Sequence, residues 1–263
     1  MGVITGFTDL DCILDGGFQK GYLYVLAARP SMGKTDLAIN IVDYICFKQH
    51  RTVVYFSLEL SGKDLTGRVL ALEAEIDPFK LRTGRIDGKD WFCIARAAET
   101  MGNSRLIVND TPAIDINNIR EKCLDYRKDA DDIAVVFIDY LQLISVSNND
   151  EARGKEMSGI VKDLKALALE LDRPIVVLSQ VSRAPEHREN HRPILSDFFT
   201  SDAVIQYADV IMFLYRDEYY NMDSESKGIT EVIVAKNSVG TVGTIELGFD
   251  PHFVKFENKI FRC

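Results

Sequence analysis

The sequence predicts an α/β fold in which helices flank a mostly parallel sheet and antiparallel strands extend that sheet at its C-terminal end. Two observations support this prediction. Short apolar segments that suit buried strands alternate with helical patterns along most of the chain, which is typical of a parallel sheet. The last part of the chain instead holds strand-like segments separated only by turn residues, which favours antiparallel pairing.

The predicted elements follow from these patterns. Six parallel strands are expected at residues 22–27, 53–57, 106–109, 133–139, 175–179 and 210–215. Three antiparallel strands are expected at residues 230–235, 244–249 and 253–257. The clearest helix precedes the fifth strand, because apolar residues between Met157 and Leu171 recur at helical spacing on one face.

Composition limits the classes of protein to consider. The 263 residues suit a single domain, 1–263, with a core of its own. A net charge of −9 argues against a surface that binds nucleic acid everywhere, although it leaves room for a local basic groove. The first residues show no basic stretch followed by an apolar core, so we expect no signal peptide, and no apolar run is long enough to cross a membrane. Five cysteines without CxxC spacing fit a reducing compartment, so we expect a cytoplasmic protein with no membrane partner.

The most specific motif is the segment Ala28–Thr35, with the sequence ARPSMGKT, which lies between a predicted strand and a predicted helix. A loop in this place leaves the first N–H groups of the helix free to bind phosphate. Gly33 permits close approach of the backbone, Lys34 brings a positive charge to the β- and γ-phosphates, and the Thr35 hydroxyl suits Mg²⁺. Gly-Lys-Thr also occurs by chance, but the flanking elements favour a nucleotide site. Its predicted residues are Ser31, Met32, Gly33, Lys34, Thr35 and Asp36.

Further polar residues follow predicted strands, where ligands bind in open α/β sheets. Asp139 ends an apolar run and suits a Mg²⁺-linked acid, or else caps the next element. Glu59 suits polarisation of an attacking water, or else is a surface acid. Gln180 suits contact with a γ-phosphate, or else is a solvated strand end. Arg183 and Arg216 are equally compatible with phosphate binding and with solvent.

Six segments together resemble the C-terminal motor domain of the DnaB-type replicative DNA helicases. The resemblance covers the chain from about Thr5 to about Phe256, in the family's order and spacing, and the leading Ala28 is itself the family's form. The segments are TGFTDLD from Thr5, ARPSMGKT, FSLEL from Phe56, IDYLQLI from Ile138, LSQVSR from Leu178 and YRDEYY from Tyr215.

The resemblance implies a RecA-like P-loop NTPase core that assembles into a hexameric ring with ATP and Mg²⁺ at the subunit interfaces. It implies that single-stranded DNA passes through the ring and that hydrolysis drives 5′-to-3′ translocation. Primase or a helicase loader are further implied partners. By position, Lys34 and Thr35 carry the phosphate and metal roles, and Glu59 is the catalytic base. Asp139 is the second metal-linked acid and Gln180 the γ-phosphate sensor.

The sequence departs from the family pattern at the site that reaches a neighbouring subunit. Lys236 is retained there as the candidate that acts in trans, but Ser238 stands where the family has an arginine finger. Such a finger is worth roughly 10³–10⁵ in rate in other systems, so slow ATP turnover is expected unless Lys236 or another arginine compensates. The family's N-terminal collar domain is also missing, so we expect either a truncated piece of a longer protein or a naturally short homologue.

The predicted DNA loop departs as well. Phe199 replaces an Arg, Thr200 a Glu and Asp202 a Gly. Phe199 suits either stacking on a base or packing against the protein. Asp202 repels phosphate and loses the freedom of a glycine at positive φ.

These features leave two functional hypotheses. The first is an ATP-dependent 5′-to-3′ DNA helicase of the DnaB type. The alternative is a divergent ATPase without unwinding activity that acts as an assembly or regulatory partner. A recombinase-like or clock-type ATPase fits the FSLE and IDYLQLI segments less well.

Overall fold

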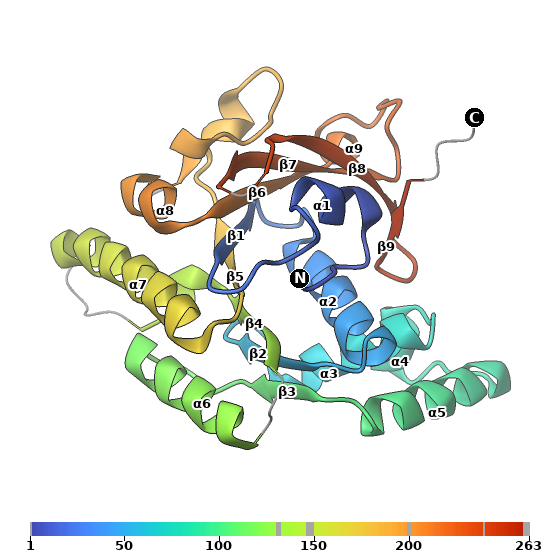
Figure 1. Ribbon diagram of the computed structural model, residues 1–263. Coiled ribbons are helices and arrows are strands. Elements are labelled where there is room, and N and C mark those ends of the chain that lie inside the picture. The colour runs from blue at the N-terminus through green and yellow to red at the C-terminus, as the bar shows by residue number, and fades with distance from the viewer. Residues whose placement is uncertain (1, 130–132, 146–149, 199–200, 239, 260–263) are drawn as a thin grey trace.

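The computed structural model describes residues 2–129, 133–145, 150–198, 201–238 and 240–259 (Figure 1). Within these residues one nine-stranded sheet has the order β3-β2-β4-β5-β1-β6-β7-β8-β9. All neighbours from β3 to β6 pair in parallel, and β6 to β9 pair antiparallel. The predicted fold class is therefore confirmed, including the change of strand direction at the C-terminal end.

The strands lie close to the predicted segments. The parallel ones are β1 (Leu23–Ala28), β2 (Thr52–Ser57), β3 (Leu106–Asn109), β4 (Ile133–Asp139), β5 (Ile175–Gln180) and β6 (Val210–Tyr215). The antiparallel ones are β7 (Ile229–Asn237), β8 (Gly243–Asp250) and β9 (Lys255–Asn258). Every residue of β1, β2 and β4 is buried, because helices cover both faces of the parallel part.

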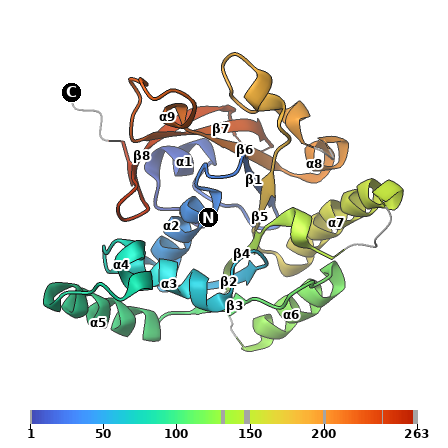
Figure 2. The same cartoon turned by 180° about the vertical axis from the view of Figure 1, so that it is seen from behind.

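Helices form the two outer layers (Figures 1 and 2). One face of the sheet packs against α1 (Thr8–Ile13), α2 (Lys34–Asp43) and α3 (Gly62–Glu73), and a π-helical turn at Tyr44–Lys48 extends α2. The opposite face packs against α6 (Ile116–Asp129), α7 (Asp150–Leu171) and α8 (Ser201–Tyr207). Shorter or peripheral helices are α4 (Pro78–Thr83), α5 (Gly88–Gly102) and α9 (Asp217–Tyr220).

The amphipathic helix predicted between the fourth and fifth strands is α7. The apolar residues from Met157 to Leu171 that recur at helical spacing are buried against the sheet. Because β1, β2, β4 and β5 run in parallel, their carboxyl ends lie at one edge of the sheet, where the residues predicted to bind phosphate and metal lie.

Candidate nucleotide-binding site

The phosphate-binding loop joins β1 to α2 through two residues with positive φ. Ser31 has a φ of 64°, and Gly33, which precedes the first residue of α2, has a φ of 91° and a ψ of 25°. Residues with a side chain rarely adopt this conformation, which explains the glycine. A Cβ at position 33 would also lie 3.2 Å from the ring of Phe256. The loop therefore needs glycine both for its backbone turn and for contact with the C-terminal strands.

A pocket of about 360 Å³ lies above this loop. It brings together all six predicted loop residues with Glu59 from the end of β2 and Gln180 from the end of β5. The full lining is Arg29, Pro30, Ser31, Met32, Gly33, Lys34, Thr35, Asp36, Glu59, Arg68, Tyr140 and Gln180. Residues far apart in the sequence thus meet at one edge of the sheet, as ligand sites in open α/β folds do.

Asp139 lies directly behind the loop and is 1% exposed. Its Oδ2 accepts hydrogen bonds from the Thr35 hydroxyl over 2.8 Å and from the Tyr55 hydroxyl over 2.9 Å. Its Oδ1 is buried and has no hydrogen-bond partner among the described residues. A buried carboxylate oxygen without a partner is costly, so its retention beside a threonine hydroxyl favours a ligand at this point.

The Thr35 hydroxyl and the Asp139 carboxylate suit Mg²⁺, which takes few protein ligands. They do not suit a cation that the protein alone must hold. Among the described residues, no cluster of three or more His, Cys, Asp or Glu side chains could hold a metal ion. Mg²⁺ normally takes one or two protein carboxylates and completes its shell with water and substrate phosphates. Thr35 and Asp139 match that requirement once a nucleotide supplies phosphate oxygens.

Lys34 is poised for an anion. Burial lowers the pKa of its ammonium, while the charges of Asp139 and Glu59 act in the opposite direction. Its Nζ lies 5.4 Å from the ring centroid of Tyr140. A partly desolvated cation of this kind is stabilised by a phosphate.

Asp36 is fixed by a residue that the sequence analysis did not single out. Burial raises the pKa of the Asp36 carboxyl, and its ion pair with Arg68 of α3, over 3.2 Å, lowers it. Arg68 also lines the pocket, where it adds a positive charge to those of Arg29 and Lys34. No motif marks this arginine, because its place depends on how α3 packs against α2.

Gln142 is a second residue whose role was missed. Its Nε2 donates to Ser179 Oγ over 3.0 Å and to the Gln180 carbonyl oxygen over 3.1 Å. Its Oε1 accepts from the Gln180 backbone N–H over 3.3 Å. Gln142 therefore holds the backbone of Gln180 while the Gln180 side chain lines the pocket. Its place in the IDYLQLI segment was the available signal.

Arg216 does not line this pocket. Its guanidinium lies 4.2 Å from the ring centroid of Phe249 and pairs with Glu218, and its Nε is buried without a partner among the described residues. The Phe249 and Phe256 rings lie 4.8 Å apart, and Phe256 faces Gly33. Arg216 is thus joined to the loop through two aromatic rings, and its role in nucleotide binding stays a prediction.

The residues predicted for trans action and DNA binding lie elsewhere. The Lys236 ammonium donates to the backbone carbonyl oxygens of Ile205 and Ala208, each over 2.6 Å, within the same chain. Ser238 is exposed, as is Asp202 near the start of α8. Phe199 and Thr200 lie outside the described residues.

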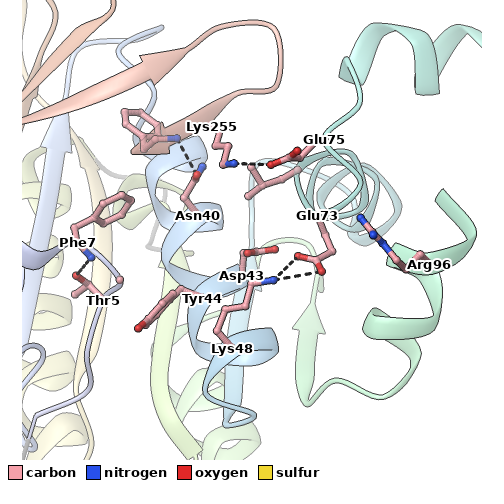
Figure 3. A pocket seen from close by; sticks show the side chains of 13 residues that line it. Thr5, Phe7, Asn40, Asp43, Tyr44, Lys48, Glu73, Glu75, Arg96 and Lys255 are labelled. Carbon is pink, nitrogen blue, oxygen red and sulfur yellow. Dashed lines mark hydrogen bonds and ion pairs between the residues drawn. The ribbon is translucent and has the colours of Figure 1, made fainter. Parts of the chain in front are cut away.

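A second cavity, of about 370 Å³, lies beside the far end of α2 (Figure 3). There burial together with the nearby carboxylate of Glu73 raises the pKa of Asp43 to about 7. Lys48 donates to Glu73 over 3.2 Å, and Lys255 donates to Glu75 over 2.5 Å. The lysines thus pair with Glu73 and Glu75, while Asp43 Oδ1 is buried without a hydrogen-bond partner among the described residues, and we assign this cavity no ligand.

Comparison of the sequence with known proteins identifies the family of the chain. The family model of the DnaB-like helicase C-terminal domain matches residues 2–258. The chain is 43% identical to replicative DNA helicase DnaB of Geobacillus stearothermophilus over 258 residues, which is 98% of this chain and 56% of that protein. It is 41% identical to replicative DNA helicase DnaC of Bacillus subtilis, with the same coverage. The chain therefore spans about half the length of these curated relatives.

Two solved structures share the fold. One, an ATPase domain, matches with a TM-score of 0.94 and 36% identity, over 99% of this chain and 92% of that one. The other, a DnaB-like replicative helicase studied with its interactions with primase, matches with a TM-score of 0.94 and 36% identity, over 99% of this chain and 62% of that one. No helix within the described part of the chain is long and apolar enough to span a membrane. The match over nearly the whole sequence shows that this chain belongs to the family of DnaB-like helicase C-terminal domains.

Proposed function

We propose that this protein is the ATP-hydrolysing motor of a 5′-to-3′ replicative DNA helicase, with residues 1–263 acting as one ATPase domain. The observation that carries the proposal is the convergence of Lys34, Thr35, Glu59, Asp139 and Gln180 around one loop. A chain that had lost catalysis would have no need to keep all five.

Each residue has a role in this proposal. The N–H groups at the start of α2 and the Lys34 ammonium bind the β- and γ-phosphates of ATP. Thr35 and Asp139 hold Mg²⁺, which when bound neutralises charge on the phosphates. Glu59 accepts a proton from the attacking water, and Gln180, held by Gln142, contacts the γ-phosphate.

The base of the nucleotide is proposed to lie on the Arg216 side of the loop. A planar guanidinium over Phe249, with its Nε unpaired among the described residues, offers a surface on which an aromatic base can stack. The Phe249 ring in turn packs against the buried Phe256, which faces Gly33. Phosphates and base would then sit on the two sides of one loop.

The proposed partners are single-stranded DNA, further copies of the chain in a hexameric ring, and primase or a helicase loader. Ring assembly would bring Lys236 of one subunit towards the ATP of the next. Two observations favour the alternative, an ATPase that regulates assembly without unwinding. Ser238 cannot supply the guanidinium of a finger, and the exposed Asp202 carboxylate repels DNA phosphates.

The test is ATP hydrolysis with and without single-stranded DNA, run beside unwinding of a forked duplex at concentrations that permit ring assembly. We expect DNA to stimulate hydrolysis and unwinding to follow 5′-to-3′ polarity. Lys34→Ala should abolish both while circular dichroism stays unchanged. Hydrolysis that DNA does not stimulate, without unwinding, would support the alternative. Unchanged hydrolysis in Lys34→Ala would refute the phosphate site.

A further inference from the structure

Arg29 follows β1 at the start of the phosphate-binding loop and lines the nucleotide pocket, but its hydrogen bonds go to the segment after β5. Its Nη1 donates to the Val181 carbonyl oxygen over 2.9 Å. Its Nε and Nη2 donate to one carboxylate oxygen of Glu186, over 2.9 and 2.5 Å. The Arg29 side chain is 12% exposed. A nearly buried cation of the loop thus holds a segment more than 150 positions later in the sequence.

Val181 directly follows Gln180, the last residue of β5, and is fully buried. Its N–H donates to the Ala28 carbonyl oxygen over 3.2 Å, and its carbonyl oxygen accepts from Arg29. Both backbone polar groups of Val181 are therefore bonded to the start of the phosphate-binding loop. Loss of the Arg29 donor would be costly, because a buried carbonyl group needs a partner. The loop and the residue after Gln180 are held together as one unit.

The end of β5 is supported from both neighbouring strands. In the sheet, β5 lies between β4 and β1. Gln142, which follows β4, holds the backbone N–H and carbonyl of Gln180. Arg29, which follows β1, holds the next residue from the other side. The position of the Gln180 side chain in the pocket therefore depends on Arg29 as well as on Gln142.

Glu186 fixes the direction of the Arg29 guanidinium. It lies in a 3₁₀ turn at Ala184–His187, and the hydrogen bond from Arg29 lowers the pKa of its carboxyl, so it is charged at neutral pH. Two donors on one carboxylate hold the planar guanidinium so that Nη1 reaches the Val181 carbonyl, a geometry that the single ammonium of a lysine does not reproduce. Glu186 does not line the nucleotide pocket, so it acts on the nucleotide through Arg29.

We propose that Arg29 is a positioning residue that, held by Glu186, fixes the Val181 carbonyl and thereby holds Gln180 at the phosphate-binding loop. The inference deepens the proposed function and rests on it for the contact between Gln180 and the γ-phosphate. It separates two properties of Arg29. Its charge contributes to binding of phosphates, whereas the direction of its guanidinium determines the place of Gln180.

Steady-state ATP hydrolysis tests the two properties separately. Glu186→Gln should lower kcat several-fold and leave KM for ATP unchanged, because positioning is lost while the charge of Arg29 remains in the pocket. Arg29→Lys also keeps that charge and should have a similar effect. The two substitutions together should cost little more than Arg29→Lys alone, since they interrupt one contact. Glu189→Gln is the matched control, because this exposed acid lies in the same segment, and it should hydrolyse ATP like the unsubstituted chain.

Hydrogen exchange of residues 181–188, measured by mass spectrometry without nucleotide, reads the contact directly. Exchange should be several-fold faster in Glu186→Gln and Arg29→Lys and unchanged in Glu189→Gln. Unchanged kcat in Glu186→Gln overturns the inference, as do fully additive losses in the double variant or a higher KM without a change in kcat. If the unsubstituted chain does not hydrolyse ATP, the proposed function fails. The exchange result still decides whether Arg29 and Glu186 hold the end of β5.

Discussion

The Thr35 hydroxyl donates a hydrogen bond to Asp139 Oδ2 over 2.8 Å, between residues 104 positions apart in the sequence. The bond ties the first turn of α2 to the end of β4. It places a hydroxyl and a carboxylate at one point, with the second carboxylate oxygen buried and unpaired among the described residues. This pair forms the centre of the proposed metal site.

Substitution of Asp139 should impair use of Mg²⁺. Asp139→Asn removes the charge that we assign to the ion, so the Mg²⁺ concentration for half-maximal hydrolysis should rise more than in Tyr55→Phe. In Tyr55→Phe only a hydrogen bond that supports Asp139 is lost. Removing such a supporting contact typically lowers metal affinity or activity by about 10–100-fold. Burial raises the pKa of Tyr55, so this hydroxyl remains a donor at neutral pH. A magnesium titration of ATPase rate measures both variants, and an unaltered Asp139→Asn curve would exclude the assignment.

Gln142 should affect turnover without affecting nucleotide affinity. Gln142→Ala removes the three hydrogen bonds that hold Ser179 and Gln180. We expect kcat to fall about 10-fold while KM for ATP changes little, since positioning in the transition state is lost and ground-state binding is not. Gln142→Glu keeps the acceptor for the Gln180 N–H, so its kcat should lie between those of Gln142→Ala and the unsubstituted chain. Equal kcat in all three proteins would show that Gln180 needs no such support.

Ser238→Arg should accelerate hydrolysis only in the assembled protein. A guanidinium at the subunit interface stabilises charge on the transferred phosphoryl group, an effect of roughly 10³–10⁵ where a finger has been removed or supplied elsewhere. We expect a gain at concentrations that support a ring and none in dilute protein. Ser238→Ala serves as the control and should hydrolyse ATP like the unsubstituted chain. If Ser238→Arg has no effect at any concentration, Ser238 does not occupy the finger position.

Asp43 should make the protein less stable as the pH rises towards neutrality. Its pKa is about 7 in the folded chain against 3.8 for the unperturbed group, chiefly because of burial, so the folded state binds more protons than the unfolded state between these values. Stability from this group is therefore present at low pH and lost as pH rises through 7. Asp43→Asn should be more stable than the unsubstituted chain by about 1–3 kcal/mol at pH 8, and the difference should shrink towards pH 4.

Chemical unfolding at several pH values measures this effect, and Glu75→Gln provides a control in the same cavity. A hydrogen bond from Lys255 lowers the pKa of Glu75, so this substitution should give a small effect of opposite sign. A difference between Asp43→Asn and the unsubstituted chain that is constant with pH would contradict the raised pKa of Asp43.

Much of the fold could be predicted from short apolar segments and from the helical period of 3.6 residues. The parallel strands, the antiparallel extension and α7 depend on local burial, and their segments differ from the structure by a few residues at most. The three helices between β2 and β3 carried weaker signals, since α4 and much of α5 are exposed. The phosphate-binding loop before α2 was predictable because the residue types alone indicate their roles. Gly33 suits a turn with positive φ, and Lys34 supplies a positive charge for a phosphate.

The sequence by itself determined the type of fold, the phosphate loop and the residue types at the ends of the strands, because backbone preference and side-chain chemistry are local. Only the tertiary structure decided which side chains meet. It paired Thr35 with Asp139 and placed Gln142 on the backbone of Gln180. It also directed Lys236 to the end of α8. These contacts join segments whose separation in space depends on strand order and helix packing, and no local pattern encodes them.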